Sequence, residues 1–225
     1  MSRVETAASR RWAVEARRSR RRLYPVTVVY TLATIAALVH ALRTSPGAAV
    51  LSWALGVAAW TWIEYMVHRF ILHGVFPDGP GLKRWTHVLF DHLHVKHHER
   101  PWDGNHINGT IRDTGPFLIP AFLVALLLPP QTLLAFLSGL AQGYVVEEWI
   151  HHAVHFYRFD NAYFRYIRAH HMYHHSQVGK DRGYGLTSGM WDAAYGTRFP
   201  AEVRRALYHA RSAPRRPPRE PAPSA

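Results

Sequence analysis

Residues 44–73 read TSPGAAVLSWALGVAAWTWIEYMVHRFILH, an apolar run that continues directly into two histidines. The first part, Thr44–Ile63, is 20 residues long and contains no Lys, Arg, Asp or Glu. A helix of about 20 apolar residues is long enough to cross a bilayer core of roughly 30 Å. Because Thr44-Ser45-Pro46-Gly47 has the composition of a turn, we predict a spanning helix that begins there and runs past Glu64 into the histidine pair.

Two further uncharged runs complete the predicted fold. Leu23–Leu42 pairs with the quoted stretch as a first hairpin, at about 23–63. Pro116–Val146 is long enough to enter the bilayer and return as two short helices broken at Pro129-Pro130, with the return helix reaching about Phe156. We therefore expect an all-α integral membrane protein with two transmembrane helical hairpins, the second at about 116–150. A soluble protein with buried core helices is the alternative, and the mean hydropathy of −0.17 slightly favours it.

The basic residues give this fold an orientation. The net charge is +12, and if both hairpins enter from one side, 26 of the 27 Lys and Arg residues lie on that side. Only Arg43 falls in a distal loop, so the positive-inside bias places both termini and the histidine groups in the cytoplasm. We expect three parts along the chain. Residues 1–22 form a basic, poorly ordered or amphipathic arm, and residues 210–225 form a disordered Arg/Pro tail. Residues 23–209 form the membrane domain, which includes two histidine-bearing cytoplasmic segments at 64–115 and 151–198.

The chain has 17 histidines and no cysteine, which excludes disulfides, thiolate zinc sites and cysteine-ligated iron–sulfur clusters. A helix places residues i, i+3 and i+4 on one face, so one turn can offer three imidazoles to a metal. Ten histidines fall into four groups spaced H-x4-H, H-x2-H-H, H-x3-H and H-x2-H-H: His68 and His73; His94, His97 and His98; His151 and His155; His171, His174 and His175.

The first pair alone is out of register on an α-helix, so the helix must bend or end near His73, where Gly74 is a suitable terminator. Ten imidazoles are too many for one ion and suit two, which predicts a dimetal site held by a cytoplasmic helical cap. Imidazole binds zinc, iron, copper and nickel alike, so the spacing leaves the metal open.

Other residues receive supporting or minor roles. Three carboxylates precede a predicted ligand by about one turn and are expected to accept its free ring N–H: Glu64, Glu148 and Asp91. Three histidines beside better-spaced neighbours stay undecided as ligands: His92, His152 and His170. Four isolated histidines are expected to be ordinary core or surface residues: His40, His87, His106 and His209.

The chain resembles the fatty acid hydroxylase/sterol desaturase superfamily, the membrane histidine-box di-iron oxygenases, and is nearest its fatty acid 2-hydroxylase branch. That branch often carries a fused cytochrome b5 domain, for which these 225 residues leave no room. The resemblance spans about 60–198, although Pro101–His106 departs from the pattern of every branch. It rests on four boxes in order and a trailing segment: EYMVHRFILH at 64–73, HVKHH at 94–98, EWIHHAVH at 148–155, HMYHH at 171–175 and GYGLTSGMWDAAYGT at 183–197.

The resemblance implies that the ten histidines hold two iron ions, with zinc able to replace iron in the purified protein. It further implies O2 as co-substrate, an external electron donor that is cytochrome b5-like or ferredoxin-like, and hydroxylation or desaturation of a membrane lipid. The substrate most directly implied is a fatty acyl or sphingolipid-type chain, and no catalytic residue beyond the metal ligands is assigned.

Three other functions stay open as alternatives. Within the superfamily, the substrate can instead be a sterol, a hopanoid or a carotenoid. A non-catalytic metal-binding or transport membrane protein would use the same histidines, but transport pathways place ionisable groups at bilayer depth, whereas these lie outside the apolar runs. A nucleic-acid-binding protein is disfavoured because the basic runs are terminal and lack interleaved aromatic residues.

Overall fold

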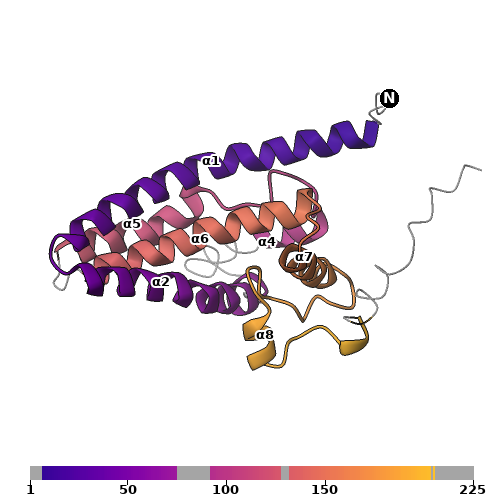
Figure 1. Ribbon diagram of the computed structural model, residues 1–225. Helices are drawn as coiled ribbons and strands as arrows, with labels where there is room; N and C mark the ends of the chain where they lie inside the picture. Colours follow the sequence, from indigo (N-terminus) through magenta and orange to yellow (C-terminus); the bar gives the residue numbers. More distant parts are fainter. Residues whose placement is uncertain (1–6, 75–91, 128–131, 204, 206–225) are drawn as a thin grey trace, which may run out of the picture.

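The computed structural model describes residues 7–74, 92–127, 132–203 and 205, and these residues are helical or irregular, without a strand among them (Figure 1). The predicted all-α class is therefore confirmed. In chain order the elements are α1 (Ala7–Leu42), α2 (Pro46–Met66), the π-helix η1 (Val67–Leu72), α4 (His92–Glu99), α5 (Ile111–Leu127), α6 (Thr132–Phe156), α7 (Ala162–His174) and α8 (Met190–Ala194).

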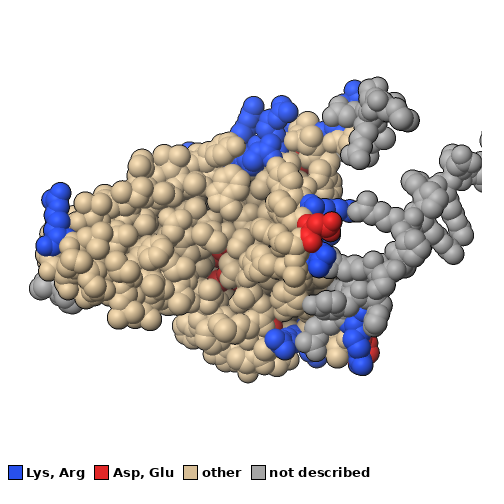
Figure 2. Space-filling view, viewed as in Figure 1, with Lys and Arg blue, Asp and Glu red and all other residues tan. Residues whose placement is uncertain are grey.

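Two helical segments are long and apolar enough to cross a membrane, Ser9–Leu42 and Pro46–Leu72. They correspond to the first predicted hairpin. Their apolar side chains point largely outward; Leu32 and Leu51, for example, are each 61% exposed. Charged side chains gather toward the α7 end of the face in Figure 2, and the other half is almost bare of them except at its tip. This exposed apolar surface favours a helix pair in contact with lipid over the alternative of a soluble protein with buried core helices.

The second predicted hairpin corresponds to α5 and α6, which pack side by side (Figure 1). As predicted, α6 ends at Phe156. The expected break at Pro129-Pro130 and the expected tail at 210–225 lie outside the described residues. With 17 residues, α5 is shorter than a typical spanning helix.

The central helix is α6, and both α1 and α2 pack along it. At the crossing of α2 and α6, a Cβ atom on Gly56 would lie 2.1 Å from the Phe136 carbonyl oxygen, and one on Gly139 would lie 2.1 Å from the Trp53 carbonyl oxygen. Only glycine permits this approach, as at the small-residue crossings of membrane helices. Gly56 precedes His68 by 12 residues, and Gly139 precedes His151 by 12 residues. His68 and His151 therefore lie at about the same distance along their helices from the crossing.

The described part of the basic N-terminal segment is helical, which agrees with the amphipathic alternative and not with the poorly ordered one. Its described part, from Ala7, forms the first turns of α1 and continues without interruption into the apolar part. Ala16, Ser19 and Leu23 are buried, because residues three or four apart on this helix face the rest of the protein. The arginines between them lie on the other faces, which explains why composition alone suggested a separate arm.

Candidate metal centre

All ten predicted histidines come together, in two groups of five. Within each group one nitrogen of every ring lies within 4.8 Å of the others. We call the first group cluster A, which consists of His68, His73, His94, His98 and His174. The second group, cluster B, consists of His97, His151, His155, His171 and His175.

Each H-x2-H-H triplet is divided between the clusters, which differs from the expectation that one turn serves one metal. On α4, His94 and His98 belong to cluster A and His97 to cluster B. On α7, His171 belongs to cluster B and His174 to cluster A, and His175, the C-terminal cap of this helix, belongs to cluster B. The cause is helix geometry: at about 100° per residue, i+4 lies about 40° past i, whereas i+3 lies about 60° short of it. α4 and α7 therefore run between the two clusters and contribute to both.

The π-helix η1 resolves the awkward spacing of the first pair. The backbone N–H of His73 donates to the His68 carbonyl oxygen at 3.1 Å, an i→i+5 bond that brings residues five apart onto one face. His73 is the C-terminal cap, and the backbone leaves the helix at Gly74, as expected. The predicted bend is thus a change of helix type that brings both rings into cluster A.

The ring nitrogens are spaced as metal ligands are. In cluster A, His73 Nε2 lies 2.7 Å from His94 Nε2 and 3.0 Å from His174 Nε2. In cluster B, His171 Nε2 lies 2.8 Å from His155 Nε2 and 3.0 Å from that of His175. A metal–nitrogen bond of about 2.1 Å places neighbouring ligands of an octahedron about 3.0 Å apart. Both clusters therefore fit a metal ion held by imidazole.

Burial prepares these rings for metal binding. Burial, and then repulsion between neighbouring imidazoles, lowers the pKa of four rings well below the usual histidine value: His94, His97, His171 and His174. Burial also lowers the pKa of His98 to about 4. At neutral pH the rings are uncharged, and an uncharged ring has the lone pair that a metal requires.

Cluster A is oriented by backbone carbonyls of the segment that precedes α8. The Nδ1–H of His174 donates to the Arg182 carbonyl oxygen at 2.8 Å, and that of His68 donates to the Tyr184 carbonyl oxygen. Such bonds fix the tautomer and turn Nε2 toward the cluster. Glu64, expected to support His68, instead accepts from the backbone N–H of Thr187 at 2.8 Å and from its hydroxyl at 2.7 Å.

Asp192 holds the same segment from the other side. Its buried carboxylate accepts from the backbone N–H groups of Tyr184 and Gly185, both at 2.9 Å, and from the Thr197 hydroxyl at 2.7 Å. Burial alone would raise the pKa of Asp192, but these bonds and the contact with His170 outweigh it and lower the pKa. Sequence reasoning gave Asp192 no role, although it lies in the quoted trailing segment.

Cluster B has no comparable support. Four of its rings have a buried Nδ1 without a hydrogen-bond partner among the described residues: His97, His155, His171 and His175. Glu148, expected to support His151, instead accepts from Asn108 Nδ2 at 2.7 Å and from the Gly109 N–H at 3.2 Å, and so fixes the loop before α5. Asp91 lies outside the described residues. The cluster B rings are therefore positioned by packing.

The undecided histidines do not join either cluster where the structure describes them. His152 Nδ1 lies 2.7 Å from Ser19 Oγ, and His170 Nε2 lies 3.0 Å from Asp192 Oδ2. His40 is exposed, and His106 lies 3.7 Å from Asp103. The side chains outside the described part are those of His87, His92 and His209.

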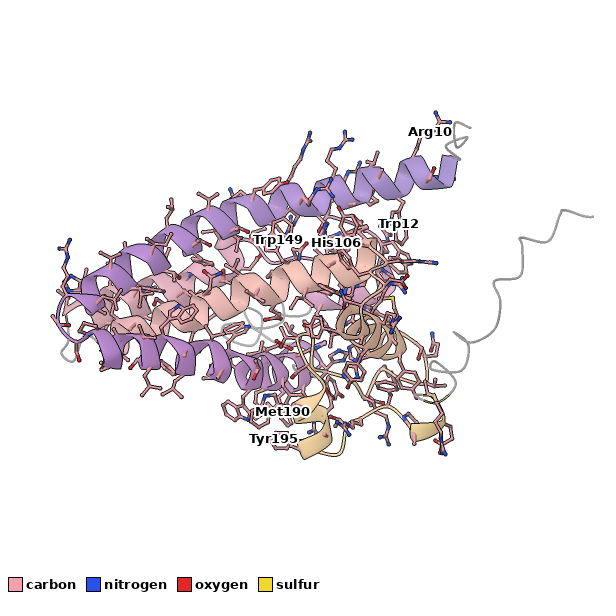
Figure 3. The ribbon with its side chains drawn as sticks, in the orientation of Figure 1. Arg10, Trp12, His106, Trp149, Met190 and Tyr195 are labelled. Carbon is pink, nitrogen blue, oxygen red and sulfur yellow. The ribbon has the colours of Figure 1, made fainter. Side chains whose placement is uncertain are left out.

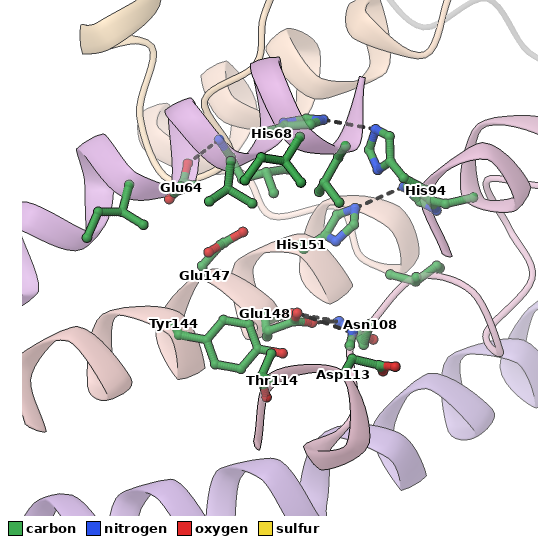
Figure 4. A pocket seen from close by; sticks show the side chains of 18 of the residues that line it. Glu64, His68, His94, Asn108, Asp113, Thr114, Tyr144, Glu147, Glu148 and His151 are labelled. Carbon is green, nitrogen blue, oxygen red and sulfur yellow. Dashed lines mark hydrogen bonds between the residues drawn. The ribbon is translucent and has the colours of Figure 1, made fainter. Parts of the chain in front are cut away.

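A cavity of about 370 Å³ leads to both clusters (Figure 4). Its volume falls in the range of small-molecule sites. The wall is mostly apolar, and includes Trp60, Ile63, Val67, Ile71 and Phe117. It reaches His68 and His94 of cluster A and His97, His151 and His171 of cluster B. One partly buried acid in this wall, Glu147, accepts from Trp60 Nε1 at 2.6 Å. The cavity can therefore hold an apolar chain against the clusters.

Comparison with known proteins gives related results. The model of the fatty acid hydroxylase family matches residues 53–197. Dihydroceramide fatty acyl 2-hydroxylase FAH2 of Arabidopsis thaliana is 34% identical over 145 residues, which cover 64% of this chain and 59% of that protein. Fatty acid 2-hydroxylase of Mus musculus is 30% identical over 154 residues, which cover 66% of this chain and 40% of that one.

A solved structure described as full-length scs7p, with only its hydroxylase domain visible, aligns with a TM-score of 0.65 and 27% identity. The alignment covers 79% of this chain and 67% of the other. The chain thus spans about half the length of the curated relatives it matches.

Proposed function

The chain belongs to the fatty acid hydroxylase family, and from this premise we propose that it hydroxylates the alkyl chain of a membrane lipid with two iron ions and O2. The observation that carries the proposal is the apolar cavity that ends on both five-histidine clusters. Matched relatives are named for 2-hydroxylation of fatty acyl chains, so a fatty acyl or sphingolipid-type chain is the proposed substrate, with desaturation the lesser alternative.

The proposed division of labour follows from the chemistry of a C–H bond. When bound by the ten histidines, two iron ions supply O2 activation and redox capacity, which no side chain of this cavity has. The overall change converts R–H, O2, two electrons and two protons into R–OH and water. An external donor supplies the electrons, and the chain's own residues hold the metals, exclude water and align the substrate.

The position of the carboxyl groups in the cavity supports oxidation near the polar end of an acyl chain. Glu64 precedes His68 by four residues and Glu147 precedes His151 by four, so each lies one helical turn from a cluster (Figure 4). The carbon at position 2 is bonded to the acyl carbonyl carbon. When this carbon lies at the metal clusters, the polar head group attached to the carbonyl must therefore lie near them as well. An amide N–H or a hydroxyl of the substrate can donate to Glu147, while the apolar wall takes the rest of the chain.

We also propose the membrane setting. In this arrangement α1 with α2 and α5 with α6 are two hairpins that enter from the cytoplasmic side, and both clusters and both termini lie in the cytoplasm. The first hairpin has the stronger support, because its two helices are long and apolar enough to cross a membrane. The membrane domain then begins with the helical turns from Ala7 and includes all of the proposed metal ligands.

The test combines metal content with lipid chemistry. The protein is purified in detergent to measure bound metal per chain, and membranes that contain it are incubated with O2 before lipid mass spectrometry. We expect two metal ions and a lipid that gains one oxygen atom with wild type, and neither the full metal content nor the product with His174→Ala. A lipid that loses two hydrogens would indicate desaturation. Two metal ions without any lipid change would contradict the enzyme and favour a non-catalytic metal-binding protein.

A further inference from the structure

Aromatic rings lead from the protein surface to cluster B. The ring centroids of Trp12, on α1, and Trp102, in the loop before α5, lie 4.7 Å apart. The Trp102 ring in turn lies 5.4 Å from the ring of His155. Both tryptophans are 37% exposed, whereas His155 is 0% exposed. Trp102 therefore separates a buried cluster B histidine from solvent while contacting both.

The two tryptophans are held by specific contacts. Trp12 Nε1 donates to the Phe156 carbonyl oxygen at 3.0 Å, at the end of α6. The Gly104 N–H donates to Glu15 Oε2 at 3.0 Å, and a Cβ atom on Gly104 would lie 2.1 Å from the Glu15 carbonyl oxygen. The loop thus packs directly on the α1 backbone. This loop contains Pro101–His106, the stretch that departs from the family pattern.

The surface beside these rings is strongly basic. Between Arg10 and Arg22 the sequence has seven arginines and one acid, Glu15. Glu15 itself pairs with Arg18 at 2.7 Å. In Figure 3, Arg10 points away from the body of the protein, while Trp12 points toward the end of α6. A concentrated positive charge of this kind attracts an acidic partner and speeds its association.

The length of α1 distinguishes a protein partner from lipid head groups. Trp12 precedes Leu23, the first residue of the apolar run, by 11 residues, or about 16 Å of helix. The head-group layer on each side of a bilayer is only about 5–8 Å thick. Arg10 and Arg11 therefore extend beyond the head groups, where a soluble protein can reach them. Lipid anchoring also gives no reason for rings that contact a metal-cluster histidine.

We propose that the N-terminal turns of α1 together with Trp102 form the docking site of an acidic one-electron carrier protein, whose electrons reach cluster B through Trp102 and His155. In each transfer the carrier would lose one electron, and an iron ion held by the cluster B histidines would accept it. Two transfers and two protons complete the balance of the hydroxylation given above. The inference rests on one part of the proposed function, which is that cluster B holds a redox-active metal.

The docking site is tested by binding, without turnover. The full chain is loaded with redox-silent zinc, which imidazole sites accept, and placed in phosphatidylcholine nanodiscs. The probes are two acidic carriers, a soluble plant-type [2Fe–2S] ferredoxin and the soluble haem domain of a cytochrome b5. We expect the affinity for at least one of them to fall about tenfold or more with Arg10→Glu/Arg11→Glu and with added salt. The matched control Arg43→Glu, in the turn between α1 and α2, should bind as wild type does.

The electron route is tested by anaerobic stopped-flow oxidation of the reduced carrier on the iron-loaded protein. Trp102→Phe keeps an aromatic ring and should transfer at close to the wild-type rate. Trp102→Leu should transfer about tenfold or more slowly with unchanged carrier affinity and metal content. Trp149→Leu, at a tryptophan of α6 whose indole N–H donates to Thr27 Oγ1 at 2.8 Å, should have no effect.

Any of three results would overturn the inference. The first is an electron-transfer rate of Trp102→Leu equal to that of wild type, and the second is unchanged carrier affinity of Arg10→Glu/Arg11→Glu. The third is that this arginine variant binds less well to phosphatidylserine vesicles but not to either carrier. Transfer to an iron-loaded protein that forms no hydroxylated lipid would support the inference and contradict the proposed function instead.

Discussion

Clusters A and B contain the same number of histidines but are supported in different ways. In cluster A, two rings donate to the carbonyl oxygens of Arg182 and Tyr184, and one ring, His98, has a buried nitrogen without a partner among the described residues. In cluster B, four rings have such a nitrogen. Outer hydrogen bonds orient a ligand and raise its basicity. The difference therefore predicts that cluster A binds metal more tightly and that cluster B is the more adaptable site.

The largest expected effect is the loss of one site at a time. We expect His174→Ala to empty cluster A and His171→Ala to empty cluster B, so that each variant retains about one metal ion per chain and loses hydroxylation. Elemental analysis of the purified variants measures this directly. If either substitution releases both ions, the clusters are coupled and the comparison between independent sites fails.

A smaller effect is expected from the clamp on the segment that orients cluster A. Asp192→Asn removes the charge that holds the N–H groups of Tyr184 and Gly185, so the carbonyl partners of cluster A should lose their positions. We expect metal affinity at cluster A to fall about 10–100-fold, with cluster B unchanged. Competition with a chelator provides the measurement. Glu202→Gln, an exposed acid-to-amide change, is the matched control, and an equal loss at both clusters would contradict the proposed role.

The two single-site variants also allow the clusters to be compared with each other. We expect the cluster A site that remains in His171→Ala to bind Zn²⁺ about tenfold more tightly than the cluster B site that remains in His174→Ala. The physical reason is the carbonyl support present only in cluster A. Isothermal titration at fixed pH measures both affinities, and equal or reversed affinities would show that ring packing supports a metal as well as hydrogen bonds do.

The smallest expected effect is a difference in proton uptake by the metal-free protein. Burial lowers the pKa of His73 and His98 in cluster A to about 4, and burial with neighbouring rings lowers that of His175 in cluster B to about 2. Between about pH 6.5 and 4 the unfolded chain then binds more protons at these positions than the folded chain, so stability falls as the pH falls through that window.

Thermal unfolding of the metal-free protein across this range should show the decline. Ring-proton NMR should show that His73 and His98 protonate before His175. Protonation of cluster B first would contradict the assigned environments.

The sequence was sufficient to predict the helical class and the ten clustered histidines, because spacing along one helix is a local property. It did not predict how the triplets divide, since that depends on which partner helix lies on each side of α4 and α7. Nor did it predict the partners of Glu64 and Glu148. Both carboxylates bind segments distant in sequence, Glu64 that around Thr187 and Glu148 that around Asn108. Such contacts exist only once α2 and α6 have packed.

The basic segment gives a second example. Its seven arginines between Arg10 and Arg22 suggested a separate arm, but the buried positions Ala16, Ser19 and Leu23 recur at helical spacing. That periodicity was the signal available in the sequence. Composition averages over all faces of a helix and therefore conceals a single face that packs.

The π-helix η1 accommodates one additional residue between the two histidines of the first pair, compared with the pair His151 and His155 on α6. From Gly56 to His68 and from Gly139 to His151 the count is the same, and the second pair then closes with H-x3-H on an α-helix, whereas the first uses H-x4-H. An insertion of one residue into a helix normally rotates everything that follows by about 100°. Here the wider turn absorbs the added residue, so His73 still faces its cluster. A chain shortened by one residue between His68 and His73 would therefore be expected to form an ordinary α-helix and become, in this region, a structural copy of its own second half.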